Sequence, residues 1–215
     1  MKHTFKTIVA SCLTVILALV LITAGSFALF TDEAKISNHL VAGNLELQLT
    51  RTAHSSKVVD AATGAGTTRA AATESVDFTG VTGENAFGLQ DGDLIVPGSE
   101  LSATFTLKNV GNVRFGYWVE LVLTDDAGTV LDPSAYTEDL AKQLKVSFNG
   151  QATPVALSTG SIALGSETDL TLVEASQTSA AFTVKVEFED REDNNDAQDE
   201  HVYFDIKVYA IQSTF

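Results

Sequence analysis

Apolar and polar residues alternate with a period of two through most of the chain after residue 40. This period places successive side chains on opposite faces of an extended strand, whereas a helix needs a spacing of three or four residues. One apolar face and one polar face are typical of antiparallel sheets that pack on one side only. The pattern is clearest in residues 45–50, 101–109, 115–124, 181–190 and 202–211.

Shorter strand candidates and turn signals separate these segments. Residues 144–148, 153–157 and 168–173 are the shorter candidates, and Pro97-Gly98 and Asn149-Gly150 are among the turns. One short helix is predicted within residues 132–144, because Asp132 before Pro133 is a suitable cap and first-turn pair. The predicted fold is all-β, an antiparallel jelly-roll-like β-sandwich with one short helix.

Residues 55–92 differ from the rest because they are rich in Ala, Thr, Gly and Ser and show little periodicity. We interpret them as a long, partly flexible surface insertion. The alternative is a seam between an N-terminal strand and the main body of the domain.

The charge and cysteine content exclude several classes of protein. The 28 acidic and 13 basic residues give a net charge of −15, so nucleic acid and anionic lipid are not expected partners. Hydrophobic residues make up 45% of the chain, which is enough to build a core. The single cysteine, Cys12, lies in the N-terminal apolar run, so the rest of the chain has no disulfide and no thiolate ligand for zinc.

The N-terminus has the pattern of an export signal. Lys2, His3 and Lys6 precede an uncharged apolar run, and Ser26 and Ala28 are small residues spaced as a signal peptidase requires. We predict a signal peptide over residues 1–28, cleaved after Ala28, so that the chain contacts the membrane only before cleavage. An uncleaved anchor is the alternative, because the run is long enough to span a bilayer. Lipidation of Cys12 is disfavoured, because too little apolar chain precedes it.

Cleavage would leave Leu29 at the start of a secreted β-sandwich domain, residues 29–215. Its first segment, residues 29–44, is predicted to pair with the sheet edge of a neighbouring subunit as a donor strand. The alternative is a frayed leader before an intramolecular strand at residues 45–50. The residues assigned to the donor strand are Leu29, Phe30, Asp32, Ile36, Leu40 and Val41.

No catalytic motif is present, so we predict that the protein is not an enzyme. Zinc peptidases commonly place two histidines and a glutamate on one helix, as in H-E-x-x-H. The histidines here are isolated in sequence, so a zinc site would have to bring together His39, His54 and His201 from distant segments. No G-x-S-x-G sequence is present either.

The acidic run over residues 187–201 is the remaining candidate for a binding site. Asp190, Asp193, Asn195 and Asp196 offer hard oxygen ligands to Ca²⁺, although the run lacks the glycine and the spacing of an EF-hand. A solvated loop between two strands is the alternative. No cofactor is predicted other than Ca²⁺ at this run.

Three segments resemble a known family. The join between signal and domain resembles export signals handled by the SipW-type signal peptidase, on Phe30, Thr31, Asp32, Ala42, Gly43, Asn44, Leu45 and Leu47. The middle of the chain resembles the TasA/camelysin family on Pro97, Gly98, Ser99, Phe105, Asn109, Gly111 and Leu121. The closing strand is similar on Asn194, Asn195, Asp196, Phe204, Ile206, Ala210 and Gln212.

The resemblance implies a secreted jelly-roll subunit of extracellular fibres in the biofilm matrix of a Gram-positive bacterium. Its implied partners are further copies or related matrix subunits, with the SipW-type peptidase and the translocon during export. A camelysin-like cell-surface metallopeptidase is the alternative. A third hypothesis is a monomeric sandwich that binds carbohydrate through Trp118, Tyr117 and Tyr203.

Overall fold

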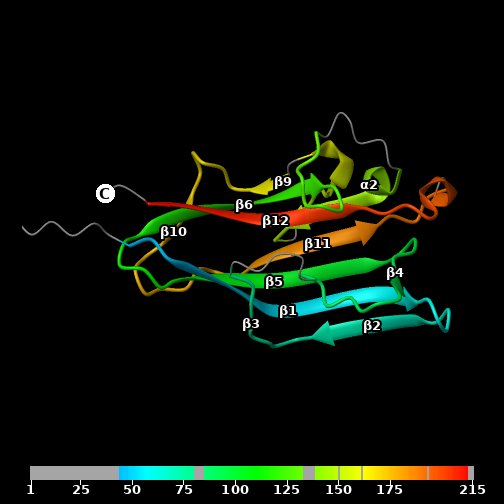
Figure 1. Ribbon diagram of the computed structural model, residues 1–215, viewed down its shortest axis with the longest axis horizontal. Coiled ribbons are helices and arrows are strands. Elements are labelled where there is room, and N and C mark those ends of the chain that lie inside the picture. Colours follow the sequence, from blue (N-terminus) through cyan, green and yellow to red (C-terminus); the bar gives the residue numbers. More distant parts are fainter. Residues whose placement is uncertain are drawn as a thin grey trace, which may run out of the picture. The chain divides into compact units, whose positions relative to one another are not determined.

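The computed structural model of the protein describes residues 44–79, 85–132, 139–149, 151–160, 162–192 and 194–212. The chain divides into two compact units, residues 1–42 and 43–215, and all of the described residues belong to the second. This unit contains two antiparallel sheets (Figure 1). The signal peptide and the assigned donor-strand residues up to Val41 lie outside the described residues.

The larger sheet, sheet A, has the order β2-β1-β5-β11-β7-β8, and β3 and β4 also pair with β1. Its strands are β1 (Leu47–Asp60), β2 (Gly66–Ala71), β3 (Val76–Asp77), β4 (Asp93–Leu94), β5 (Glu100–Asn109), β7 (Leu144–Phe148), β8 (Val155–Ala156) and β11 (Phe182–Phe188). The smaller sheet, sheet B, has the order β10-β6-β12, with β9 on β6. Its strands are β6 (Phe115–Thr124), β9 (Ile162–Leu164), β10 (Thr171–Val173) and β12 (Tyr203–Gln212).

The core lies between the two sheets and contains the alternate residues that the sequence places inward. On β5, Leu101, Ala103, Phe105 and Leu107 are all buried. Phe182 of β11 stacks on Phe105 at 5.5 Å between ring centroids and also contacts Tyr117 of sheet B at 6.4 Å. The predicted all-β antiparallel sandwich is therefore confirmed.

Helical turns occupy the connections. The helix α2 (Asp139–Gln143) lies within the segment predicted to be helical and leads directly into β7, whose bounds match the prediction. Short 3₁₀ turns, η2 (Leu157–Thr159) and η3 (Asn194–Ala197), follow β8 and β11.

Residues 55–92 correct one expectation, because part of the predicted insertion has regular structure. Residues 55–60 continue β1, residues 66–71 form β2, and the two strands pair from His54↔Ala71 to Val59↔Gly66. Strand pairing is a property of the backbone, so β2 forms although few of its side chains are apolar. The periodicity is weak because β2 lies at the edge of the sheet, where half of its residues are exposed.

A bulge in β1 reverses which residues face the core. Arg51 is opposite Phe105, but Ala53 is opposite Thr104, so Thr52 is the extra residue. Before the bulge, Leu47, Leu49 and Arg51 share the inner face; after it, His54, Ser56 and Val58 do. Arg51 faces inward before the bulge and the reversal adds His54 and Ser56, so three polar side chains lie on the inner face of β1.

Candidate functional site

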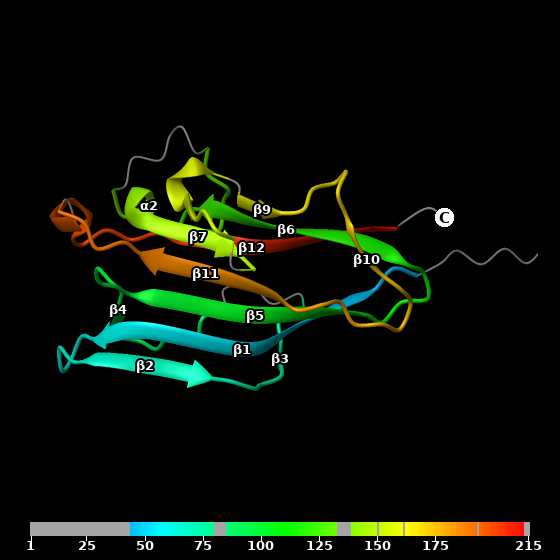
Figure 2. The ribbon, with the colours of Figure 1, turned by 180° about the vertical axis from the view of Figure 1, so that it is seen from behind.

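Among the described strands, β12 forms the longest edge of sheet B that no further strand pairs with. This strand pairs with β6 from Tyr203↔Thr124 to Gln212↔Phe115, and no other strand in the described part of the chain pairs with it. Figure 2 shows β12 beside β6 from behind. The opposite side of β12 therefore presents backbone N–H and C=O groups that could pair with an added strand.

The inner face of β12 is only partly covered. On β6, Val119 and Leu121 are 0% exposed, whereas their direct partners on β12, Val208 and Ile206, are only partly buried. Apolar side chains half-covered along an unpaired edge form a surface that an alternating strand could complete. The residues concerned are Phe204, Ile206, Val208 and Ala210.

A segment that overlaps the end of the predicted insertion packs against the inner face of β1. We call residues 85–96 the covering segment. Its Phe87 is 4% exposed, and its Ala86, Leu89 and Ile95 are partly buried against the core. Phe87 also contacts Phe204 of β12, at 6.0 Å between ring centroids.

Arg51 joins the covering segment to β1. Its Nε and Nη2 donate to the two carboxylate oxygens of Glu74 at 2.7 and 3.2 Å, while Nη1 donates to the carbonyls of Asn85 and Ala86 at 2.8 and 3.0 Å. The guanidinium also lies 5.2 Å from the ring centre of Phe78. Only 8% of Arg51 is exposed, so these contacts are largely shielded from water.

His54 and Ser56 add further contacts on the same face. The Nδ1 of His54 lies 2.8 Å from Oε1 of Glu74, and the Ser56 hydroxyl donates to the carbonyl of Phe87. Gly88 has a φ of +70° and packs against the His54 ring so closely that a Cβ there would clash with it. We call Arg51, His54, Ser56 and Glu74 the polar clamp.

The surroundings of Glu74 keep it ionised. Burial alone would raise the pKa of its carboxyl, but hydrogen bonds and charge from His54 and Arg51 outweigh burial and hold the pKa below its ordinary value. Both carboxylate oxygens are thus engaged by cationic or potentially cationic groups. The clamp is a charge-assisted network rather than a set of isolated polar residues.

The clamp does not have the chemistry of a hydrolase. The pair of His54 and Glu74 resembles the histidine and acid of a catalytic triad, but the nearby Ser56 hydroxyl donates to the Phe87 carbonyl. Arg51 holds both carboxylate oxygens of Glu74, where a metal ion would have to bind. No group of three His, Cys, Asp or Glu side chains able to hold a metal occurs among the described residues. The residues of this part do not fit a zinc site.

The other histidines and the acidic run do not join this site. His201 is exposed just before β12, and His39 lies outside the described part of the chain. Of the residues proposed for calcium, Asp190 is exposed after β11, and Asn195 and Asp196 are exposed on η3. The Asn195 side chain accepts a hydrogen bond from Gln198 at 3.2 Å. Asp193 is not described, and the calcium site stays a prediction.

The aromatic residues considered for carbohydrate lie in different environments. Tyr117 is buried at 4% exposure, which corrects its assignment as a stacking residue. Trp118 stacks on Tyr209 with ring centroids 4.8 Å apart, and Tyr203 is 48% exposed at the other end of β12. These residues do not form one binding platform.

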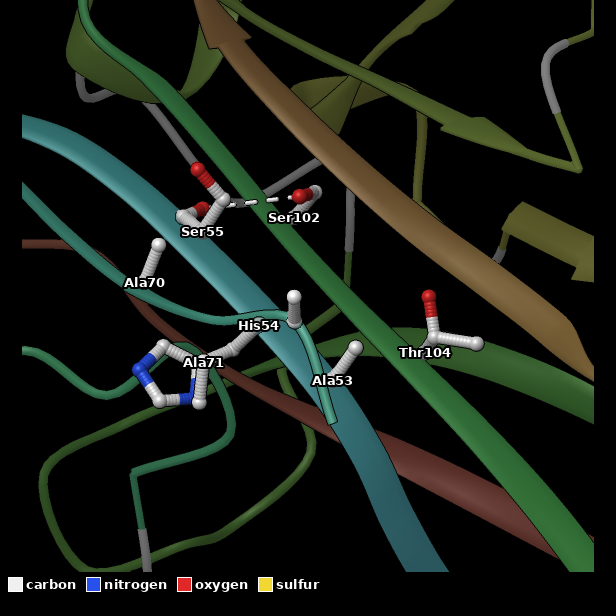
Figure 3. Close-up of a pocket in the computed structure, with 8 residues that line it drawn as sticks. Ala53, His54, Ser55, Ala70, Ala71, Ser102 and Thr104 are labelled. Carbon is white, nitrogen blue, oxygen red and sulfur yellow. Dashed lines mark hydrogen bonds between the residues drawn. The ribbon is translucent and has the colours of Figure 1, made fainter. Parts of the chain in front are cut away.

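A shallow depression of about 260 Å³ lies across β2, β1 and β5. Figure 3 shows the small side chains of Ala53, Ala70, Ser102 and Thr104 around it, while the His54 ring points away from them. The Ser102 hydroxyl lies 3.5 Å from the Ser55 carbonyl. His54 also lines the depression, but its ring does not point toward the hydroxyls of Ser102 and Thr104.

Together these features define an all-β sandwich with an unpaired edge strand, a covering segment and no metal-ligand cluster in the described part. Residues 3–69 match the model of a family described as the camelysin metallo-endopeptidases, which confirms the resemblance to the TasA/camelysin family. The matched residues include β1 with Arg51 and His54. No match was found among the curated proteins. In the part of the chain that the structure describes, no helix is both long and apolar enough to cross a membrane.

Sequence reasoning identified His54 but not the clamp around it. Arg51 and Glu74 are far apart in sequence, and His54 shares the inner face with Arg51 only because of the bulge at Thr52. The unpaired edge of β12 was also missed, because alternation predicts a strand but not its place in a sheet. A polar run of Arg51, His54 and Ser56 within a strand was the one signal that could have indicated a buried polar network.

Proposed function

We propose that the protein is a secreted bacterial structural protein, a TasA-like subunit of extracellular biofilm-matrix or surface fibres that assembles by β-strand donation. The observation that carries the proposal is the unpaired edge of β12 with its half-covered apolar face. In this proposal residues 29–44 of one subunit pair with that edge in the next. Head-to-tail contacts of this kind form a ring if the rotation between neighbouring subunits closes, and otherwise they generate a filament.

The chemistry of both partners supports this pairing. An added strand would provide hydrogen-bond partners for the free edge and would cover Ile206 and Val208, which the subunit itself leaves partly exposed. Fully burying an aliphatic side chain contributes about 1.5–3 kcal/mol, so a few such residues make a stable contact. In the donor segment, Leu29, Phe30, Ile36, Leu40 and Val41 are the apolar residues available for this purpose.

Electron microscopy of the mature protein, residues 29–215, tests the proposal against a variant that begins at residue 45. The mature protein is expected to form fibres and the shortened variant to remain dispersed. The variant retains all of β1, so circular dichroism should show the same β content in both proteins. Fibres that form equally well without residues 29–44 would exclude strand donation by this segment.

Export processing belongs to the same proposal. We propose that a SipW-type signal peptidase cleaves after Ala28, following passage through the translocon, and that the product is extracellular. Cleavage then acts as a switch, because it frees Leu29 as the first residue of the donor segment. N-terminal sequencing of the secreted product checks this step; a product that begins at Met1 would indicate a retained anchor instead.

A camelysin-like cell-surface metallopeptidase is the second candidate, because the family matched by residues 3–69 is described as a metallo-endopeptidase. The described residues offer no ligand cluster, so any metal site would need side chains from outside them, such as His39. Metal analysis of the secreted protein, together with a casein-cleavage assay with and without a chelator, tests this function. Chelator-sensitive cleavage that the variant His39→Ala lacks would support it.

A further inference from the structure

Phe87 lies against the inner face of β12. The ring contacts Phe204, and Phe204 belongs to the apolar face of β12 together with Ile206 and Val208. Phe87 is 4% exposed, so it is a part of the core and not a residue of the surface. One end of the half-covered face is therefore occupied by the subunit's own side chain.

The covering segment reaches β12 through this side chain and not through its backbone. In the described part of the chain, no backbone hydrogen bond joins residues 85–96 to β12. Its backbone is held by β1, through Arg51 at the carbonyls of Asn85 and Ala86 and through Ser56 at the carbonyl of Phe87. Residues 93–94 of the covering segment form β4, which pairs with β1, so release of the clamp contacts would free Phe87 while this pairing stays in place.

We propose that Phe87 is an autoinhibitory residue: it occupies the place of a donor side chain beside Phe204, and the polar clamp determines how readily it leaves. The inference rests on the proposed assembly by strand donation. The partner that displaces Phe87 is the donor segment, residues 29–44, of a second copy. Assembly then requires two events, the arrival of a free donor segment and the opening of the covering segment.

Glu74 is the residue through which the clamp can be weakened without removing its packing. Its two oxygens hold the Arg51 guanidinium in the position from which Nη1 reaches Asn85 and Ala86. The substitution Glu74→Gln keeps the size of the side chain but removes the charge. Because hydrogen bonds to charged groups are stronger than neutral ones, the covering segment should open more often in this variant.

Hydrogen exchange and fibre growth, measured on the same preparations of residues 29–215, test the inference. Glu74→Gln is expected to increase the rate of amide exchange in residues 85–89 by about tenfold, which corresponds to a fall of about 1.4 kcal/mol in the free energy of opening. It is also expected to shorten the lag before fibres form. Glu120→Gln is the control, because Glu120 accepts a hydrogen bond from Trp118 on sheet B and touches no residue of the clamp. Faster exchange without faster assembly would overturn the autoinhibitory role, and unchanged exchange would overturn the role of the clamp.

A second variant shows whether the effect of Glu74→Gln comes from the clamp or from general destabilisation of the protein. Ser56→Ala removes only the hydroxyl that donates to the Phe87 carbonyl, and Ser147→Ala on β7 is a matched buried control. Ser56→Ala is expected to shorten the lag and Ser147→Ala to leave it unchanged; equal lags in the two variants would contradict the inference. The exchange measurement does not depend on fibres. If the wild type forms none, the exchange result still tests the clamp, while strand donation and autoinhibition both fail.

Discussion

At the scale of single residues, Arg51 shows how a charged side chain becomes part of a core. It shares the inner face of β1 with Leu47 and Leu49, and Glu74, two carbonyls and the Phe78 ring surround it. Its sequence neighbours predict alternation without a break, and a bulge depends on the partner strand as well as on the strand itself. For this reason the sequence predicts the strand but not the clamp.

Replacement of Arg51 by methionine tests how much these contacts contribute to the stability of the fold. Arg51→Met keeps an extended side chain but leaves Glu74 without its cation, so the free energy of unfolding should fall by about 3–5 kcal/mol. Arg114→Met is the matched control, because the Arg114–Glu174 pair is 3.5 Å long and its Glu174 is mostly exposed, so it should contribute less than about 1 kcal/mol. Urea denaturation followed by circular dichroism measures both. Similar losses in the two variants would contradict a special role for the buried pair.

The same contacts predict how stability depends on pH. The pKa of Glu74 is lower in the folded protein than its ordinary value of 4.5, so the unfolded chain binds the proton first as the pH falls. The stabilisation is therefore fully present above about pH 4.5 and is lost as the pH falls through the folded pKa. Urea midpoints from pH 3 to pH 7 should fall less steeply at the acid end for Glu74→Gln than for the wild type. Parallel curves would show that Glu74 does not contribute.

At the scale of elements, the strands with one buried face are the ones that the sequence predicts well. Residues 144–148 form β7 as expected, and β12 is shifted by one residue from its predicted bounds. Strand β2 was missed because pairing at a sheet edge needs backbone groups and not apolar side chains. The free edge of β12 cannot be predicted from the sequence for a similar reason. Alternation is a property of one strand, whereas an edge is a property of the whole sheet.

Gly111 tests how the start of β1 is attached to the turn between β5 and β6. A Cβ on Gly111 would come within 2.8 Å of the backbone nitrogen of Glu46 and would clash with the carbonyl of Asn44. Gly111→Ala should therefore lower the free energy of unfolding by about 1–3 kcal/mol, because the backbone has to shift. Gly66→Ala is the control, as a Cβ there meets nothing within 4 Å. Thermal unfolding compares the two, and equal melting temperatures would contradict close packing at Gly111.

At the scale of the whole molecule, the acidic charge opposes the proposed assembly. The whole chain has a net charge of −15, and the mature subunit, which lacks Lys2 and Lys6, is more acidic still. This charge keeps subunits apart in solution, and the apolar face of β12 has to overcome the repulsion. The donor segment and the edge provide attraction over a few ångströms, whereas charge repulsion extends over a Debye length of about 8 Å at physiological salt. Salt concentration should therefore control how fast subunits meet, while the polar clamp controls how fast they join.

Fibre growth at increasing sodium chloride tests this balance. Screening should shorten the lag between about 0.01 and 0.15 M salt, where the Debye length falls from about 30 to about 8 Å. A lag that lengthens with salt would show that attraction between unlike charges, and not apolar burial, drives assembly. Calcium chloride at matched ionic strength gives a second result from the same experiment. Screening depends on ionic strength, so Ca²⁺ and Na⁺ should shorten the lag equally if screening is the sole cause. A shorter lag with Ca²⁺, lost in the double variant Asp190→Asn and Asp196→Asn, would establish the predicted calcium site.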